Sequence, residues 1–316
     1  MRYYEHFISD FNRYPLTYSI DKCVVVGFLE FRTIDYLLNA IDKLYYKHLN
    51  ITCEKEMSVP WLTDELFFWH TTYYENKKNL SFVHNFNFEL KDGLTGEFNT
   101  FWLGLGFNRF GTIDYTRWKL EFNPNKALPC EFTENLLQLL IVNSYDIGLN
   151  EFDVAVDFPL KRDLFSMSVN NGRKYSFIYN SNQDKTEYSG TRHTNGFTKI
   201  YNKTLESKLK TDLTRIEFTF TDINYNSVIV GLPDIFITDY KQLMIDGVGE
   251  LNDTERFILH TLLNEPTRIN ELGRKMKIKM KNILDGYVYS YCVNEKDFRR
   301  CIDILKSIPI VKVALC

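Results

Sequence analysis

The chain has 316 residues, of which 44% are hydrophobic and 25% charged, the composition of an ordinary globular protein of one or two domains rather than a disordered one. No apolar run approaches the roughly 18 residues that span a bilayer, and the start lacks the apolar core of a signal peptide, so we expect a cytoplasmic protein without membrane contact. The net charge of −3 at pH 7 argues against nucleic-acid binding unless the cations are clustered.

The first two thirds of the chain predict a sheet with two helices. An apolar run from Cys23 to Leu29 is typical of a strand, and apolar residues at helical spacing follow it. Between about residues 79 and 123 polar and apolar residues alternate, which indicates a largely antiparallel sheet, and further strands are predicted at 152–158, 197–202 and 215–220. The helical positions are Ile34, Leu37, Leu38, Ile41 and Leu44 in the first helix and Leu136, Leu137, Leu140 and Ile141 in the second.

The pattern changes near residue 246, which divides a predicted core of residues 1–245 from a C-terminal helical region of residues 246–316. Residues 253–263 predict a capped amphipathic helix that ends at Asn264-Glu265-Pro266. Two shorter helices are expected to face it, the second through Ile269, Leu272 and Met276 and the third through Ile278, Ile283 and Leu284. The fold class is therefore α+β, a large, mostly antiparallel curved sheet with helices packed on one face and a C-terminal helical segment.

Basic residues gather in this C-terminal region. Between Arg268 and Lys281, six basic residues stand against the single acid Glu271, a net charge of +5 in fourteen residues. A helix with these residues in a DNA groove would contact phosphates and base edges. Lysines alternate with apolar residues from 275 to 281, as they would on a strand, and of the two interpretations we prefer the helix.

Four acidic residues interrupt apolar strands: Glu121, Asp153, Asp157 and Glu217. Charges inside central strands are costly. Because side chains alternate along a strand, Asp153 and Asp157 share one face, opposite the apolar neighbours. This face is either simply exposed to solvent or a carboxylate cluster for Mg²⁺ or Mn²⁺, which prefer oxygen ligands.

A tyrosine lies between two lysines in the segment 197–203. A strand here places Phe197, Lys199, Tyr201 and Lys203 on one face. A free phenol has a pKa of about 10 and is a poor nucleophile near neutral pH unless cations or a metal favour the phenolate. Lys199 and Lys203 would do this and hold a phosphate. The alternative is structural, since tyrosine is common in strands and the chain has 20.

The cysteines are spread over the whole chain without a Cys-x-x-Cys pair. This spacing argues against a zinc ribbon or a dense disulfide framework. We expect reduced thiols at Cys23, Cys53, Cys130, Cys292, Cys301 and Cys316.

Four segments together resemble a known family, the trans-acting replication initiators of small rolling-circle plasmids of Gram-positive bacteria. They are Leu-Glu-Phe-Asn-Pro-Asn-Lys at 120–126, Phe-Asp-Val-Ala-Val-Asp-Phe at 152–158, Gly-Thr-Arg-His-Thr-Asn-Gly-Phe-Thr-Lys-Ile-Tyr-Asn-Lys at 190–203 and Arg-Ile-Glu-Phe at 215–218. Their order and spacing both fit, and the resemblance runs from about Thr17 to Leu284.

The resemblance implies that Tyr201 is a nucleophile that cuts one strand at the double-strand origin and stays joined to the 5′ phosphate, while the new 3′-OH primes replication. It also implies that the four strand carboxylates supply or support a Mg²⁺ or Mn²⁺ site. It further implies a homodimer that binds the origin DNA of its plasmid and recruits a host helicase. The residues expected to contact DNA are Arg192, Asn195, Arg274, Lys275, Lys277, Lys279 and Lys281.

Two positions depart from the family pattern. Relatives have an acid where His193 stands and a basic residue where Gly196 stands, so this loop is expected to bind DNA differently. His193 is a metal ligand, a proton shuttle or a polar loop residue. The chain lacks the His-hydrophobic-His pair of the larger relaxases, which favours carboxylate metal binding. The alternatives are a nickase of a conjugative element and a non-catalytic DNA-binding regulator that uses residues 253–285 alone.

Overall fold

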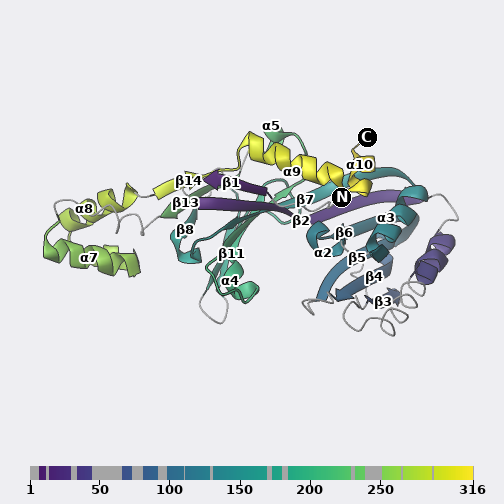
Figure 1. Ribbon diagram of the computed structural model, residues 1–316, viewed down its shortest axis with the longest axis horizontal. Coiled ribbons are helices and arrows are strands. Elements are labelled where there is room, and N and C mark those ends of the chain that lie inside the picture. Colours follow the sequence, from purple (N-terminus) through teal and green to yellow (C-terminus); the bar gives the residue numbers. More distant parts are fainter. Residues whose placement is uncertain are drawn as a thin grey trace.

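Two long strands organise the computed structural model of the chain, which Figure 1 shows with its longest axis horizontal. They are β2 (Tyr14–Leu29) and β7 (Ser144–Phe158), which pair with each other at the centre of a large sheet. The structure describes residues 7–11, 14–29, 34–44, 66–72, 81–91, 98–109, 111–128, 131–168, 173–179, 184–228, 232–238, 251–264, 266–286 and 288–315.

Within these residues, eleven strands form the large sheet, and every pairing in it is antiparallel. The order is β3-β4-β5-β6-β2-β7-β12-β11-β10-β9, with β1 paired to β2. The other strands are β1 (Phe7–Phe11), β3 (Leu66–Thr72), β4 (Phe82–Lys91), β5 (Phe98–Arg109), β6 (Thr112–Phe122), β9 (Tyr175–Tyr179), β10 (Lys185–Ser189), β11 (Phe197–Asn202) and β12 (Thr214–Phe220). In Figure 1, β11 and β3–β5 descend from the two long strands, so the sheet is curved, as predicted.

One face of this sheet forms the core. Phe152, Val154, Val156 and Phe158 alternate along β7 and are fully buried. Helices cover this face, and their apolar side chains belong to one cluster with these β7 residues, which confirms the predicted architecture. They are the helix at residues 34–44, α2 (Pro124–Ala127), α3 (Glu131–Val142), α9 (Glu295–Ser307) and α10 (Pro309–Ala314).

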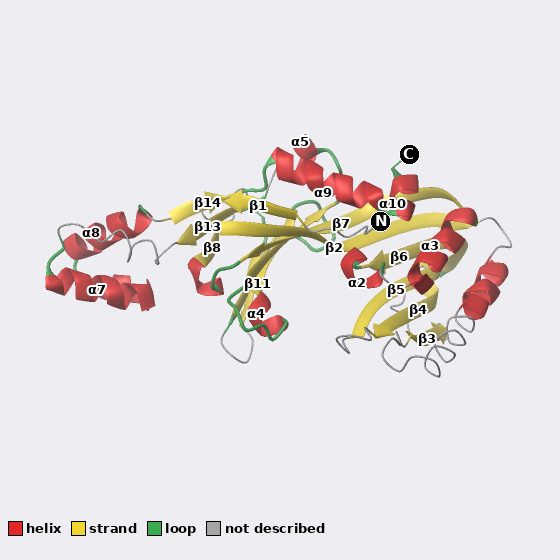
Figure 2. Cartoon of the chain, viewed as in Figure 1, coloured by secondary structure: helices red, strands yellow, loops and turns green. Residues whose placement is uncertain are grey.

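The C-terminal region contains two structurally different parts. One is a small helical module with its own apolar cluster, made of α7 (Asp253–Asn264), the 3₁₀ helix η2 (Pro266–Glu271) and α8 (Arg274–Asp285). The other is β14 (Val288–Tyr291), which joins a second sheet with β13 (Asp234–Thr238) and β8 (Phe165–Ser168), followed by α9 and α10 on the large sheet. Figure 2 shows α7 and α8 far from α10. The predicted boundary near residue 246 lies outside the described residues.

Helix α9 belongs to the core because its apolar residues share one face. Phe298 is 1% exposed, and its ring centre lies 5.1 Å from that of Phe220. We expect Phe298→Ala to lower the free energy of unfolding by about 3–5 kcal/mol, measured by urea denaturation. The matched control is Arg299→Ala on the exposed face of α9, which should cost less than about 1 kcal/mol. Equal losses in both variants would contradict this placement.

The described cysteines agree with the expected reduced state. Cys23, Cys292 and Cys301 are all free, and the first and last are buried. Cys53, Cys130 and Cys316 lie outside the described residues. Among the described helices, none has both the length and the apolar character needed to cross a membrane.

Candidate active site

The face of the sheet opposite the core carries polar side chains in three adjacent rows across β7, β12 and β11. The rows are Asp157, Arg215 and Tyr201, then Ala155, Glu217 and Lys199, then Asp153, Thr219 and Phe197. The alternate residues Val154, Val156, Ile200, Ile216 and Phe218 are buried on the core face. The predicted alternation is therefore confirmed, and the strand register decides which polar groups meet.

Tyr201 lies in direct contact with a carboxylate. Its hydroxyl donates a hydrogen bond of 2.6 Å to Oε1 of Glu217, and the residue is only 5% exposed. Nζ of Lys199 lies 3.3 Å from the other oxygen of Glu217 and 3.7 Å from the centre of the Tyr201 ring. The phenol, the carboxylate and the ammonium thus form one compact group.

The surroundings raise the pKa of the Tyr201 phenol here, and the expected effect of the two lysines on it stays a prediction. Burial raises the pKa of Tyr201 well above its ordinary value, and the negative charge of Glu217 raises it further. The phenol is therefore protonated at neutral pH and needs a base to become a nucleophile. Glu217 accepts its hydrogen bond and is placed to take the proton.

Contrary to the prediction, Lys203 does not continue the strand. The strand β11 ends at Asn202, whose side chain accepts a hydrogen bond from the backbone of Leu205 and starts the short helix α4 (Lys203–Glu206). Nζ of Lys203 still lies 5.8 Å from the centre of the Tyr201 ring, and it also forms an ion pair with Glu206. Two ammonium groups flank the phenol, one from a strand and one from a helix.

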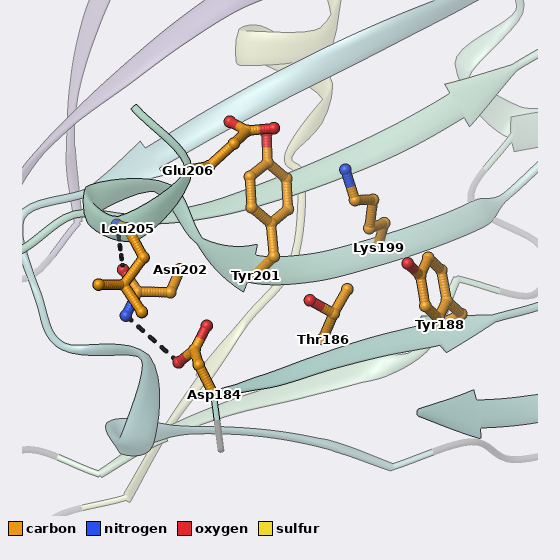
Figure 3. A pocket seen from close by; sticks show the side chains of 8 residues that line it. All are labelled: Asp184, Thr186, Tyr188, Lys199, Tyr201, Asn202, Leu205 and Glu206. Atoms are coloured by element: carbon orange, nitrogen blue, oxygen red, sulfur yellow. Dashed lines mark hydrogen bonds between the residues drawn. The ribbon is translucent and has the colours of Figure 1, made fainter. Parts of the chain in front are cut away.

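An open cavity of about 320 Å³ adjoins Tyr201. Figure 3 shows Tyr201 and Lys199 rising from β11 on the same side as Thr186 and Tyr188 from β10. The cavity is lined by Asp184, Thr186, Tyr188, Lys199, Tyr201, Asn202, Leu205 and Glu206. A substrate group that enters here meets both the candidate nucleophile and Lys199.

The four predicted metal ligands do not converge in this structure. Each has a basic partner of its own: Lys119 lies 3.7 Å from Glu121, Lys22 lies 3.5 Å from Asp153, Arg215 binds Asp157 through two hydrogen bonds, and Lys199 binds Glu217. Among the described residues no three His, Cys, Asp or Glu side chains form a group that fits a metal ion. This donor arrangement does not fit a single four-carboxylate site, and the assignment of these residues as ligands stays a prediction.

Sequence reasoning missed a second charged group beside these rows. Lys22 of β2 forms an ion pair with Glu151 and contacts Asp153, and these carboxylates raise its pKa although burial lowers it. Burial raises the pKa of the Asp153 carboxyl to about 6. A register shift between Ile20 and Lys22 brings Lys22 opposite Asp153, and no sequence pattern announces such a bulge.

The loop between β10 and β11 is closely tied to the sheet. His193 adopts a positive φ of 63°, and its Nδ1 lies 3.1 Å from Glu151. Asn195 accepts a hydrogen bond from the backbone of Thr221 and so helps to hold the loop in place. Of the two loop residues expected to contact DNA, Arg192 is exposed to solvent, whereas Asn195 already has a structural contact.

The basic segment is a helix, so the strand alternative is excluded. Arg274, Lys275, Lys279 and Lys281 are exposed on α8. Lys279 pairs with Glu255 at 2.6 Å, and Lys277 donates a hydrogen bond to Asn270. The predicted inner face of this helix is wrong at Ile278, which is 52% exposed, and Met280 is buried instead. Met276, which we predicted on the preceding helix, belongs to α8.

Comparisons with known proteins cover about half of the chain in sequence. No family model matches it. Two curated proteins named replication initiation protein, from Staphylococcus aureus, are 29% and 28% identical over 54% and 55% of this chain, and the chain spans just over half of their length. A solved structure described as a rolling circle replication initiator protein from Geobacillus stearothermophilus aligns with 85% of this chain and 97% of that chain at 12% identity. Its TM-score of 0.34 is too low to support a structural argument.

Proposed function

We propose that this chain, which is related in sequence to staphylococcal replication initiation proteins, starts rolling-circle replication of a plasmid by nicking one strand at the double-strand origin. The observation that carries the proposal is the contact between the Tyr201 hydroxyl and Glu217, with Lys199 beside both. A nucleophile, a base and a cation for the phosphate are the groups that such a reaction needs.

The proposed chemistry is a transesterification. The Tyr201 oxygen forms a bond to phosphorus as the bond to the 3′ oxygen breaks, which leaves a 5′-phosphotyrosyl link and a free 3′ end. The phenol proton passes to Glu217, and the departing 3′ oxygen takes a proton from water. Lys199 and Lys203 stabilise the charge that develops on the phosphoryl oxygens.

A divalent ion remains part of the proposal as an expectation. Mg²⁺ or Mn²⁺ would polarise a phosphoryl oxygen when bound. Each of the four strand carboxylates is paired with a basic side chain here. The nicking assay tests the requirement directly, by comparing Mg²⁺, Mn²⁺ and a chelator.

Origin binding is proposed for the helical module. Arg274, Lys275 and Lys281 are exposed on α8 and form no ion pair with any described residue. A basic helix on an otherwise acidic protein is suited to the DNA backbone and grooves. Homodimer formation and recruitment of a host helicase are proposed with it, on the resemblance alone.

Removal of two of these cations should weaken binding to DNA without affecting the chemistry. We expect Arg274→Ala with Lys275→Ala to lower the affinity for the origin. The slope of affinity against salt concentration should fall by the amount expected for about two lost phosphate contacts, measured by titration at several salt concentrations. Nicking of a short single strand should persist. The matched control is Arg299→Ala with Lys306→Ala on α9. Equal loss of both activities in the α8 variant would count against this division of roles.

The function itself is tested with supercoiled plasmid that carries the cognate origin. The wild-type protein should convert it to the open circular form and remain covalently attached to the cut strand. A protein that binds the origin without cutting it would instead be a DNA-binding regulator.

A further inference from the structure

Two aromatic side chains stand beside the candidate nucleophile on the same face of the sheet. Tyr188 of β10 pairs directly with Lys199 of β11, and Phe197 precedes Lys199 by two residues on β11. Their rings are stacked, with centroids 6.1 Å apart and planes inclined by 19°. Both residues are half-buried, so part of this aromatic surface faces solvent.

A cation adjoins the aromatic pair. The guanidinium carbon of Arg192 lies 5.9 Å from the centre of the Tyr188 ring, which is within the range of a cation–π contact. The loop that carries Arg192 is held by Arg173, which donates hydrogen bonds of 2.9 and 3.4 Å to the carbonyls of Gly196 and Asn195. The cation and the rings are therefore positioned together.

The cavity offers a cation and an aromatic ring side by side, because Lys199 and Tyr188 are direct partners on β11 and β10 and both line it. Its lining includes the carboxylates of Asp184 and Glu206 together with Thr186 and Asn202. The edge of an uncharged base offers amino groups and acceptors to such side chains, whereas Lys199 is the cation that this lining offers to a phosphate. The phosphate thus belongs next to Lys199, and a base fits over Tyr188. A volume of about 320 Å³ leaves room for one such group.

We propose that Tyr188, supported by Phe197 and Arg192, stacks against the base of a nucleotide next to the scissile phosphate. The inference rests on the proposed nicking function and names a substrate subsite for it. Only a base that has left the duplex exposes its face to a tyrosine, so the ligand is a single-stranded segment. Stacking on an aromatic ring strengthens binding by roughly 5- to 100-fold for each base and tolerates any sequence.

The test uses single-stranded oligonucleotides that span the mapped nick, each with an abasic residue at one position. For the wild type we expect KM to rise roughly 5- to 100-fold at one position beside the nick, with kcat little changed. Tyr188→Ala should raise KM for the intact strand by a similar factor and show no further loss at that abasic position. Tyr188→Phe keeps the ring and should stay close to the wild type.

The control is Tyr179→Ala, which removes an exposed tyrosine from β9 and should change neither constant. Because each variant is compared with itself on intact and abasic strands, a general loss of activity in Tyr188→Ala cancels. An abasic penalty that is undiminished in Tyr188→Ala overturns the subsite, and so does a wild type that tolerates every abasic position. A wild type that cuts neither oligonucleotide nor plasmid refutes the nicking function itself.

Discussion

Tyr201→Phe is expected to abolish both nicking of the supercoiled origin plasmid and the covalent protein–DNA adduct. The substitution removes one oxygen, which is the atom that would attack phosphorus, and keeps the ring that packs at this position. We expect a fall of at least about a thousandfold in the rate, because no neighbouring hydroxyl takes the same place in the row. The measurement is the fraction of open circular DNA with time, together with the protein-linked DNA that survives denaturation.

Origin binding gives the control for this variant. Loss of the hydroxyl also removes the hydrogen bond to Glu217, which costs roughly 1–3 kcal/mol of folding stability and leaves the protein folded. Affinity for the origin should therefore stay within about twofold of the wild type. Tyr179→Phe on β9 is the matched substitution at an exposed tyrosine and should be fully active. A fully active Tyr201→Phe protein would remove Tyr201 from the mechanism.

Glu217→Gln is expected to lower the nicking rate by about a hundredfold to ten-thousandfold. The amide preserves the shape of the side chain and its contact with Tyr201, but it does not accept a proton as a carboxylate does. Because burial raises the pKa of Tyr201, a phenol without this base stays protonated across neutral pH. The measurement is the single-turnover rate from pH 6 to pH 9.

The pH dependence separates a base from a merely structural contact. In Glu217→Gln the reaction depends on ionisation of the phenol itself, so the rate should climb by about tenfold for each pH unit over this range. The wild type should depend less steeply on pH. Origin binding should be retained, and Glu134→Gln at an exposed position of α3 should behave as the wild type. A parallel fall at every pH would assign Glu217 to positioning.

The apolar pattern of the sequence predicts much of the fold because burial imposes it residue by residue. Strand β11 covers the predicted residues 197–202 but ends before Lys203, and the alternate residues of β7 are buried as expected. The same logic failed on α8, where Ile278 was expected inside and Met280 is buried instead. Helical spacing puts Met276, Met280, Ile283 and Leu284 on one face of α8, so the error came from dividing these residues between two predicted helices.

Tertiary contacts also decided where the C-terminal helices pack. The sequence predicted a single helical region over residues 246–316, and the helices α7, α8, α9 and α10 do form there. Yet α9 and α10 return to the core of the large sheet, while α7 and α8 pack on each other. Helical periodicity shows that a face is apolar, but it does not say which surface that face will cover.

The sequence by itself determined the alternation that puts Tyr201, Lys199 and the acidic residues on the open face of the sheet, because side chains of a strand alternate with a period of two. Which of them touch was decided only by the tertiary structure. Register between β11 and β12 places Lys199 opposite Glu217, and register between β12 and β7 gives Asp157 to Arg215. These pairings join residues up to 58 positions apart, a separation over which local pattern carries no information about register.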